Sequence, residues 1–295
     1  MRSLLFVPGD SERKLEKGLA SGADALLIDL EDSVAPDNKK LARETCCDFL
    51  RANPDRLSGP ALYVRVNAFD SALTDDDLGA IMSGRPDGIM LPKSNHGNDV
   101  TRLSAKLAVQ EAENNLDEGT TRIIAIATET AEGTLHCATY KGASDRLIGM
   151  SWGAEDLAAD VGAREKRHID GTYRDLFRHA RLQCLLGAVA AGVQPIDTVY
   201  TDFRNSVGLR KECEEAAIDG FTGKMAIHPA QVPAINEAFT PDKAAIDRAQ
   251  RIVETFENAG NPGVIGLDGE MLDQPHLKLA RSLIDRARLA GVLPR

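Results

Sequence analysis

Several features that would assign a protein to a common class are missing from this sequence. The 295 residues contain no apolar run of transmembrane length, and the five cysteines and six histidines show no CxxC or other metal-binding spacing. Neither a GxGxxG nor a GxxxxGK[ST] string lies in a strand-to-helix turn, so a nucleotide cofactor has no support. The odd number of cysteines and the lack of a signal peptide predict reduced thiols in a cytoplasmic protein.

The sequence also lacks an excess of basic residues. Lysine and arginine number 35 against 45 aspartates and glutamates, which gives a formal net charge of -10. Neutralising nucleic-acid phosphates requires a basic face, so a general nucleic-acid binder is excluded. No membrane partner is expected. Any anionic ligand must therefore meet a local cluster of basic side chains.

What the sequence does contain is a regular alternation of short apolar runs with longer amphipathic or alanine-rich segments. This alternation is typical of repeated βα units. Eight runs of strand length are present, and eight parallel strands close a (β/α)8 TIM barrel. The predicted strands are residues 4–7, 25–30, 62–66, 88–91, 123–127, 147–150, 194–197 and 224–227. Helices are predicted between them, including residues 12–20, 39–50, 99–116, 172–191 and 204–217.

Beyond the eighth strand the chain continues into a predicted helical extension. No low-complexity linker marks a boundary before it, so residues 1–240 are expected to form one α/β barrel domain. Residues 241–295 contain two predicted helices, near 241–258 and 275–289, with a glycine-rich segment 261–273 between them. A barrel does not need such a tail. We therefore expect it to cover the barrel mouth or to pack at a subunit interface.

Polar side chains follow the predicted strands, at the end where a parallel barrel builds its active site. Glu129 and Asp156 come just after the fifth and sixth strands, and Arg65 lies at the end of the third. Two carboxylates on one rim predict a shared divalent metal such as Mg2+, held by a few oxygens together with substrate and water. Either acid alone could instead cap the helix that follows it. Together with Arg65, the two acids favour a metal site.

Further polar residues follow the other strands and are expected at the same rim. Lys93 could pair with a neighbouring acid, and we do not expect it to form a Schiff base. His228 is expected to be structural, because no acid or second histidine lies at catalytic spacing from it. The remaining residues of this group are Asp29, Glu31, Asp32, Asn67 and Asp197.

Eight short strings run from the first residues to the last predicted helix. They are LFVPGD at Leu5, LIDLEDSVAP at Leu27, RVN at Arg65, LPKS at Leu91, ATET at Ala127, GAEDLAADVGA at Gly153, GFTGKMAIHPAQV at Gly220 and MLDQP at Met271. In this order they resemble the motifs of the citrate lyase beta-subunit-like enzymes, a group within the HpcH/HpaI aldolase superfamily that includes malyl-CoA and citramalyl-CoA lyases.

The resemblance implies roles for individual residues. Glu129 and Asp156 match the Mg2+ ligands, with Mn2+ able to substitute, and Glu31 and Asp32 match acids that support the metal through water. Arg65 matches the substrate arginine. The resemblance further implies a homotrimer, or a hexamer built from two trimers.

The resemblance also gives Asp273, in the MLDQP string, a role that its position alone does not suggest. It matches an acid/base aspartate that reaches the active site of a neighbouring subunit. Considered without the family, Asp273 reads as a helix N-cap ahead of Pro275, and this alternative stays open.

The expected reaction is carbon–carbon cleavage of a 3-hydroxyacyl-CoA thioester by an oxo-acid lyase, in the retro-Claisen or aldol direction. Malyl-CoA or citramalyl-CoA would give acetyl-CoA and a small keto acid, glyoxylate or pyruvate. Arg65 would stabilise the enolate that cleavage leaves behind, and Asp273 would move the proton. The backbone amides of Gly153, Ala154 and Glu155 could hold the carboxylate of the keto acid.

The CoA phosphates would require basic side chains near the barrel mouth. Arg13 and Lys17, with Lys14, follow the VPGD turn and could supply them, or could form a solvated helix face paired with Glu12 and Glu16. Three other functions stay open. They are a malyl-CoA thioesterase, the citryl-thioester lyase beta subunit of a citrate lyase complex with partner subunits, and a catalytically silent assembly subunit.

Overall fold

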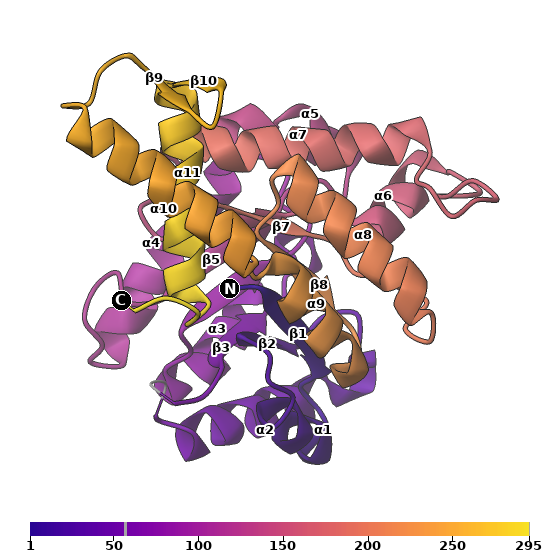
Figure 1. The fold of residues 1–295 in the computed structure, drawn as a ribbon. Helices are drawn as coiled ribbons and strands as arrows, with labels where there is room; N and C mark the ends of the chain where they lie inside the picture. The colour runs from indigo at the N-terminus through magenta and orange to yellow at the C-terminus, as the bar shows by residue number, and fades with distance from the viewer. Residues whose placement is uncertain (56–57, 295) are drawn as a thin grey trace.

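Eight parallel strands form a closed barrel in the computed structural model, which describes residues 1–55 and 58–294 (Figure 1). The strand β1 pairs with both β2 and β8 and so closes the ring. All eight predicted strands are confirmed, with small differences at their ends. They are β1 (Ser3–Pro8), β2 (Ala25–Asp29), β3 (Ala61–Arg65), β4 (Gly88–Leu91), β5 (Arg122–Ile126), β6 (Leu147–Ser151), β7 (Gln194–Asp197) and β8 (Gly223–Ala226).

The strands form because both of their faces are buried. Along β1, Leu4 packs inside the barrel with Leu27 and Met225, whereas Leu5 packs outward in the larger core beneath the helices. Successive side chains of a strand point to opposite faces, so this alternation supplies an inner and an outer core from the same residues. The continuous apolar runs of the sequence follow from this burial on two sides.

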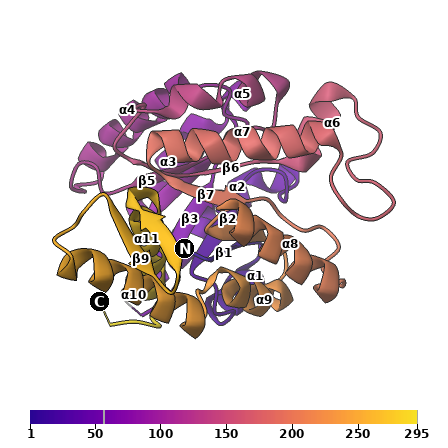
Figure 2. The same cartoon turned by 45° about the horizontal axis from the view of Figure 1, so that its top comes forward.

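Helices and 3-10 turns surround the strands (Figure 2). The helices of the barrel layer are α1 (Glu12–Leu19), α2 (Lys39–Ala52), α3 (Thr74–Ile81), α4 (Gly97–Glu113), α5 (Ala131–Leu135), α6 (Ala154–Val161), α7 (Asp175–Ala191), α8 (Ser206–Asp219) and α9 (Val232–Phe239). The 3-10 turns are η1 (Pro36–Asn38), η2 (Phe69–Ser71), η3 (Met82–Gly84), η4 (Cys137–Tyr140) and η5 (Pro229–Gln231). Within the described part of the chain, no helix is both long and apolar enough to cross a bilayer.

Helix ends differ from the sequence prediction where a side chain or a bridge decides them. The helix predicted from residue 172 begins at Asp175, because Tyr173 forms an isolated bridge with Arg167. The helix predicted from residue 99 begins earlier, at Gly97. There the ring of His96 caps it by accepting a hydrogen bond from the Asn98 backbone at 3.1 Å.

The C-terminal extension contains two helices and a hairpin. They are α10 (Lys243–Asn258), β9 (Val264–Leu267), β10 (Glu270–Asp273) and α11 (Gln274–Leu289). The extension has a small core of its own, in which Phe256 and Leu272 are buried. The predicted helices are present, but the segment 261–273 is not merely a glycine-rich connection. Asp268 and Gly269 both have positive φ, at 53° and 81°, which fits a two-residue turn between antiparallel strands.

The extension leaves the barrel at the amino end of the strands. The Arg2 guanidinium, at the start of β1, donates a hydrogen bond from Nη1 to Thr240 Oγ1 at 3.0 Å. Ser3 Oγ donates to Asn236 Oδ1 at 2.7 Å, just before α10 begins. Both figures show the N-terminus beside α10 and α11 (Figures 1 and 2). The extension therefore begins at the end opposite to the carboxyl rim.

Candidate active site

A cavity of 370 Å3 lies at the carboxyl end of the barrel. It brings together the three residues on which the predicted site depends, Arg65, Glu129 and Asp156. The strand ends and the loops after them contribute its whole lining, which is Phe6, Pro8, Asp29, Asp32, Ser33, Arg65, Ile126, Glu129, Gly153, Ala154, Glu155, Asp156, Thr198, Val199, Met225 and Ile227. The cavity thus has charged walls and an apolar part formed by side chains such as Phe6, Ile126 and Met225.

Arg65 is held rigidly by the neighbouring strand. It pairs in register with Asp29 of β2, so the two side chains lie next to each other. Arg65 Nε and Nη2 donate to the two oxygens of Asp29, both at 2.7 Å, and Nη1 lies 2.9 Å from Glu31 Oε2. Burial alone would lower the pKa of Arg65, but these acids outweigh it and raise the pKa above its ordinary value. Arg65 is therefore a fixed, permanent cation in the cavity wall.

Asp29 serves as the anchor for this arginine. Its carboxylate also accepts hydrogen bonds from the backbone of Glu31 at 2.9 Å and of Ser33 at 3.1 Å. Burial raises its pKa, yet Arg65 and these hydrogen bonds hold the pKa below its ordinary value. Asp29 stays ionised and orients Arg65.

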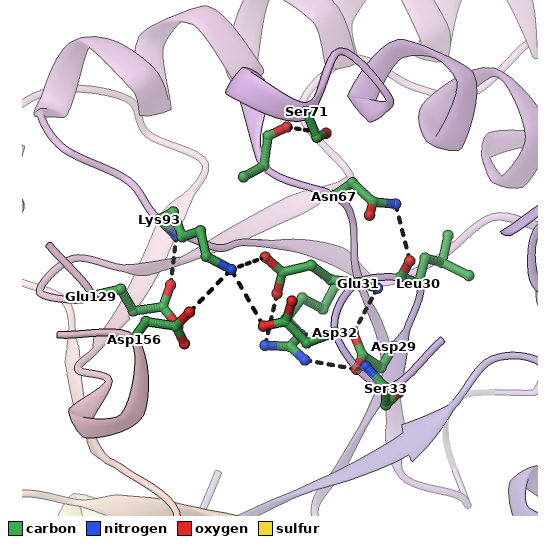
Figure 3. A network of polar contacts seen from close by, with 12 residues as sticks. Asp29, Leu30, Glu31, Asp32, Ser33, Asn67, Ser71, Lys93, Glu129 and Asp156 are labelled. Atoms are coloured by element: carbon green, nitrogen blue, oxygen red, sulfur yellow. Dashed lines mark hydrogen bonds and ion pairs between the residues drawn. The ribbon is translucent and has the colours of Figure 1, made fainter. Parts of the chain in front are cut away.

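Lys93 lies among the carboxylates of the cavity rim (Figure 3). Its Nζ is 2.5 Å from Glu31 Oε1 and 3.3 Å from both Asp32 Oδ2 and Asp156 Oδ1. Its backbone, with φ at 49°, donates a hydrogen bond to Glu129 Oε2 at 2.6 Å. One residue thus contacts all four acids, which agrees with the predicted pairing of Lys93 with a neighbouring acid.

The ionised form of Glu129 is disfavoured in the cavity, and a further positive charge would stabilise it. Its side chain is buried, and burial together with Asp156 and Glu31 raises its pKa to about 8. A bound cation would remove this penalty, because it stabilises the ionised forms of Glu129 and Asp156 together. The donor set is made of hard carboxylate oxygens, which fits Mg2+.

The protein side chains alone do not complete a metal site. Over residues 1–55 and 58–294, no three histidine, cysteine, aspartate or glutamate side chains are placed to hold a metal ion. Mg2+ commonly keeps several waters and takes one or two protein carboxylates. The arrangement therefore fits the predicted coordination by two acids together with substrate and water.

Gly153 allows the loop after β6 to lie directly against Glu129. A Cβ atom on Gly153 would be 2.5 Å from Glu129 Cγ, closer than real contacts permit. Gly153 is also the N-cap residue of α6, so Ala154, Glu155 and Asp156 form the first turn of that helix. The first backbone amides of a helix have no partner within it, which leaves them free to bind an anion. Glu155 itself pairs with Lys166.

Five predicted rim residues do not line the cavity. Glu31 and Lys93 lie beside its acids, as described above, whereas Asn67, Asp197 and His228 have other contacts. Asp197 is buried on the outer side of the barrel, where it contacts Trp152 and Lys224, so its expected place at the rim is wrong. Asn67 bonds instead to Asp77. His228 is structural as predicted, since its ring accepts a hydrogen bond from the Ala230 backbone at 3.1 Å.

Asp273 does not line the cavity of its own chain. It lies at the end of β10 as the N-cap residue of α11, with its carboxylate 2.5 Å from His276 Nδ1. The N-cap alternative thus describes its place within a single chain. Its role in a neighbouring subunit stays a prediction.

Arg13 and Lys17 are exposed on α1. The helix begins shortly after Pro8, which lines the cavity. Glu12 and Glu16 are exposed on the same helix, so the alternative of a solvated helix face stays open. Neither Arg13 nor Lys17 lines the cavity, and their binding to CoA stays a prediction.

Sequence reasoning missed the group that supports the loop after β6. Trp152 and Lys224 each donate a hydrogen bond to Asp197 beneath the helices. A signal was available in the sequence. Lys224 lies within a strand whose four residues are all buried, and a buried lysine requires an acidic partner.

Comparisons with known proteins show the family of this chain and agree with its fold. A family model described as HpcH/HpaI aldolase/citrate lyase matches residues 2–229. The citrate lyase subunit beta of Escherichia coli strain K12 is 36% identical over 293 residues, which cover 99% of this chain and 94% of that protein. A (3S)-malyl-CoA thioesterase of Cereibacter sphaeroides is 36% identical over 291 residues, covering 97% of this chain and 94% of that protein.

A solved structure extends the similarity to three dimensions. The protein CitE from Mycobacterium tuberculosis, in complex with magnesium, acetoacetate and coenzyme A, superposes with a TM-score of 0.76. It is 33% identical in sequence, and the match covers 97% of this chain and 99% of that one. The similarity therefore includes the C-terminal extension as well as the barrel.

Proposed function

This chain belongs to the HpcH/HpaI aldolase/citrate lyase family, and on that premise we propose that it is a Mg2+-dependent carbon–carbon lyase acting on a 3-hydroxyacyl-CoA thioester. The main observation behind the proposal is that Arg65, Glu129 and Asp156 line the same cavity at the barrel mouth. The magnesium, acetoacetate and coenzyme A of the Mycobacterium tuberculosis structure support the same classes of ligand here.

Glu129 and Asp156 would hold the metal ion. When bound, Mg2+ would draw electrons from the substrate hydroxyl and from the bond that breaks. Mn2+ is expected to substitute, because carboxylate and water ligands also suit it. Glu31 and Asp32 lie beside this position and would hold metal-bound water, with Lys93 compensating their charge.

Arg65 would stabilise the negative charge that develops on the thioester half. In malyl-CoA or citramalyl-CoA, the bond between the hydroxyl carbon and the carbon next to the thioester breaks. The hydroxyl gives its proton to a base, proposed as Asp273 of a second copy, and the electron pair of the broken bond passes into the thioester enolate. A fixed guanidinium lowers the free energy of such an oxyanion. The backbone amides of Gly153, Ala154 and Glu155 would hold the carboxylate of glyoxylate or pyruvate.

Asp273 of a second copy would return a proton to the enolate carbon and so release acetyl-CoA. Its own chain places it on the extension, which leaves the barrel at the end away from the cavity. Exposed apolar side chains on the extension, among them Met271, Leu279 and Leu289, support packing against another subunit. We therefore assign residues 1–240 to the catalytic barrel and 241–295 to an interface extension of a homotrimer or hexamer.

The CoA part of the substrate requires positive charge in a chain that is acidic overall. Arg13 and Lys17 would bind its phosphates from the exposed face of α1. All five cysteines are free and buried, which supports a reducing, cytoplasmic location.

Incubating the purified protein with malyl-CoA and with citramalyl-CoA tests the proposal directly. We expect acetyl-CoA and the keto acid in equal amounts with Mg2+, and neither product after EDTA. Turnover that does not depend on metal, or no turnover of any 3-hydroxyacyl-CoA, would contradict the proposal.

The curated relatives supply two alternatives. The similarity to a (3S)-malyl-CoA thioesterase favours hydrolysis of the same bound thioester, and free CoA without keto acid would identify that reaction. The similarity to a citrate lyase beta subunit favours a citryl thioester on a carrier protein. Copurification of partner subunits, with cleavage only of the carrier-bound thioester, would identify it.

A further inference from the structure

A second group of charged residues lies outside the cavity, between the barrel and the helices α7 and α8. Asp197 of β7 and Lys224 of β8 pair in register and are both fully buried. Lys224 Nζ donates to Asp197 Oδ2 at 2.8 Å and to Glu212 Oε1, also at 2.8 Å. Arg181 of α7 approaches the same aspartate, with Nε 3.3 Å from Oδ1. Asp197 is thus fixed by two cations.

Asp197 in turn fixes Trp152. The indole Nε1 donates a hydrogen bond to Asp197 Oδ1 at 2.7 Å, and the Trp152 side chain is completely buried. Its ring also meets Tyr173 edge to face, with the ring centroids 5.1 Å apart. Burial alone raises the pKa of Asp197, but Lys224 and Arg181 hold the pKa below its ordinary value. The indole therefore donates to an ionised carboxylate, which makes a strong hydrogen bond.

Trp152 is directly joined to the cavity wall. It precedes Gly153, whose backbone lies so close to Glu129 that no Cβ atom would fit. The peptide between Trp152 and Gly153 is therefore held on both sides, by Asp197 outside the barrel and by Glu129 inside it. Asp156 and the first amides of α6 follow within one helical turn.

Stability alone does not explain this group. Removing charges from water is costly, and apolar residues of similar volume often stabilise a core equally well or better than a buried ion pair. What apolar residues cannot do is fix an indole by a directional hydrogen bond. Residues that orient a metal-binding shell in this way commonly change metal affinity or activity by about 10–100-fold when they are replaced.

We propose that Asp197, supported by Lys224, is a positioning residue that acts through Trp152 to fix the Gly153–Asp156 turn for metal and keto-acid binding. The inference rests on the proposed function for the identity of these ligands. Asp197, Lys224 and Trp152 do not line the cavity. The sequence predicts Asp197 at the rim and assigns no role to the other two.

Trp152 offers a direct readout, because it is the one tryptophan in the sequence. Trp152→Phe removes the indole N–H and keeps a ring in the core. Asp197→Asn weakens the link while keeping the tryptophan as a fluorescent reporter. The matched control is Glu111→Gln, which makes the same change in the buried Glu111–Arg146 pair before β6.

Mg2+ affinity, steady-state kinetics and tryptophan emission would be measured on variants that circular dichroism shows to be folded. For Trp152→Phe and Asp197→Asn we expect about tenfold weaker Mg2+ binding and a lower kcat, with a smaller change in the KM for the thioester. In metal-free Asp197→Asn the emission should move to longer wavelength, because the indole is held less firmly. Glu111→Gln should keep wild-type affinity and emission.

The outcomes separate this inference from the proposed function. Mg2+ affinity within twofold of wild type in both variants, or an equal loss in Glu111→Gln, would overturn the positioning role. If the wild-type protein binds Mg2+ but cleaves no thioester, the proposed function fails, while the affinity series still decides the role of Asp197. A wild-type protein that binds no Mg2+ would overturn both.

Discussion

At the scale of single residues, Glu129 links the chemistry of the site to its stability. Its raised pKa, about 8, means that the ionised form is disfavoured in the folded, metal-free protein. For an acid whose pKa is raised in the folded state, the stabilising contribution is present below the unfolded pKa. It is lost as the pH rises from about 4.5 to about 8. A neutral side chain would avoid this loss and would also remove a metal ligand.

We therefore predict opposite effects of Glu129→Gln on stability and on metal binding. At pH 8.5 without metal, its Tm should exceed that of the wild type, whereas addition of Mg2+ should raise the Tm of the wild type only. Thermal unfolding with and without Mg2+ measures both. Glu132→Gln, on the exposed side of α5, is the control and should resemble the wild type. A Mg2+-induced rise in Tm for Glu129→Gln would contradict the assignment.

Arg65 allows a second prediction at this scale. Arg65→Lys keeps a positive charge but loses the two-pronged pairing with Asp29, so the charge is no longer fixed. We expect kcat/KM to fall by about 100- to 1000-fold, the usual loss when one oxyanion-stabilising group is removed. Steady-state kinetics measure the fall. Arg43→Lys breaks a similar contact with Asp77 away from the cavity and should retain most activity.

The positions of single residues could be predicted where one rule was sufficient, namely that residues at the carboxyl ends of parallel barrel strands converge. Arg65, Glu129 and Asp156 follow strands of a parallel barrel, so their convergence could be expected. Asp197 also lies at the end of a barrel strand, but its side chain points away from the cavity. Ile196 occupies the inner face of the strand, so the next side chain must point outward.

At the scale of elements, β6 is anchored by charged groups at both ends. Trp152 follows it, and Arg146 precedes it. Arg146 Nη1 and Nη2 donate to the two oxygens of Glu111 on α4, both at 2.6 Å. Burial raises the pKa of Glu111, but Arg146 and the backbone amides of Thr121 and Gly119 outweigh it and lower the pKa to about 2.

This pair predicts a specific acid sensitivity. A lowered pKa contributes stability that is complete above the unfolded pKa of about 4.5 and is lost as the pH falls toward about 2. The loss is at most about 3 kcal/mol. Urea unfolding at pH 6 and pH 3 should show a smaller loss for Glu111→Gln than for the wild type. Equal losses in the two proteins would show that other carboxylates govern acid unfolding.

The elements themselves were predictable to different degrees. All eight barrel strands follow from apolar runs that are buried on two sides. The hairpin β9–β10 was missed, because its strands are short and partly exposed and their apolar pattern is weak. The Asp268-Gly269 pair was the available signal, since this dipeptide favours a two-residue hairpin turn.

At the scale of the whole molecule, the barrel could be predicted from the number of strands, whereas the place of the extension could not. That place depends on contacts such as Arg2 with Thr240, which join residues far apart in the sequence. No local pattern encodes such a pairing. If Asp273 acts in a neighbouring subunit, as proposed, Arg65 and Asp273 of one chain belong to different sites.

Mixing two inactive variants tests this separation. Arg65→Ala and Asp273→Ala should each lose activity when purified alone. Coexpressed as mixed oligomers, they should recover about a quarter of the wild-type sites, because some interfaces then combine an intact Arg65 with an intact Asp273. Differently tagged chains confirm mixing. Full activity of Asp273→Ala alone, or no recovery in verified mixed oligomers, would argue against a shared site.

An extension that departs from the base of the barrel also affects how the protein behaves when it is scarce. A monomer would have the metal-binding residues of the active site but would lack the proton donor that a second chain supplies. Turnover per chain would then decline on dilution. A newly synthesised chain would not cleave thioesters until it had assembled with other subunits.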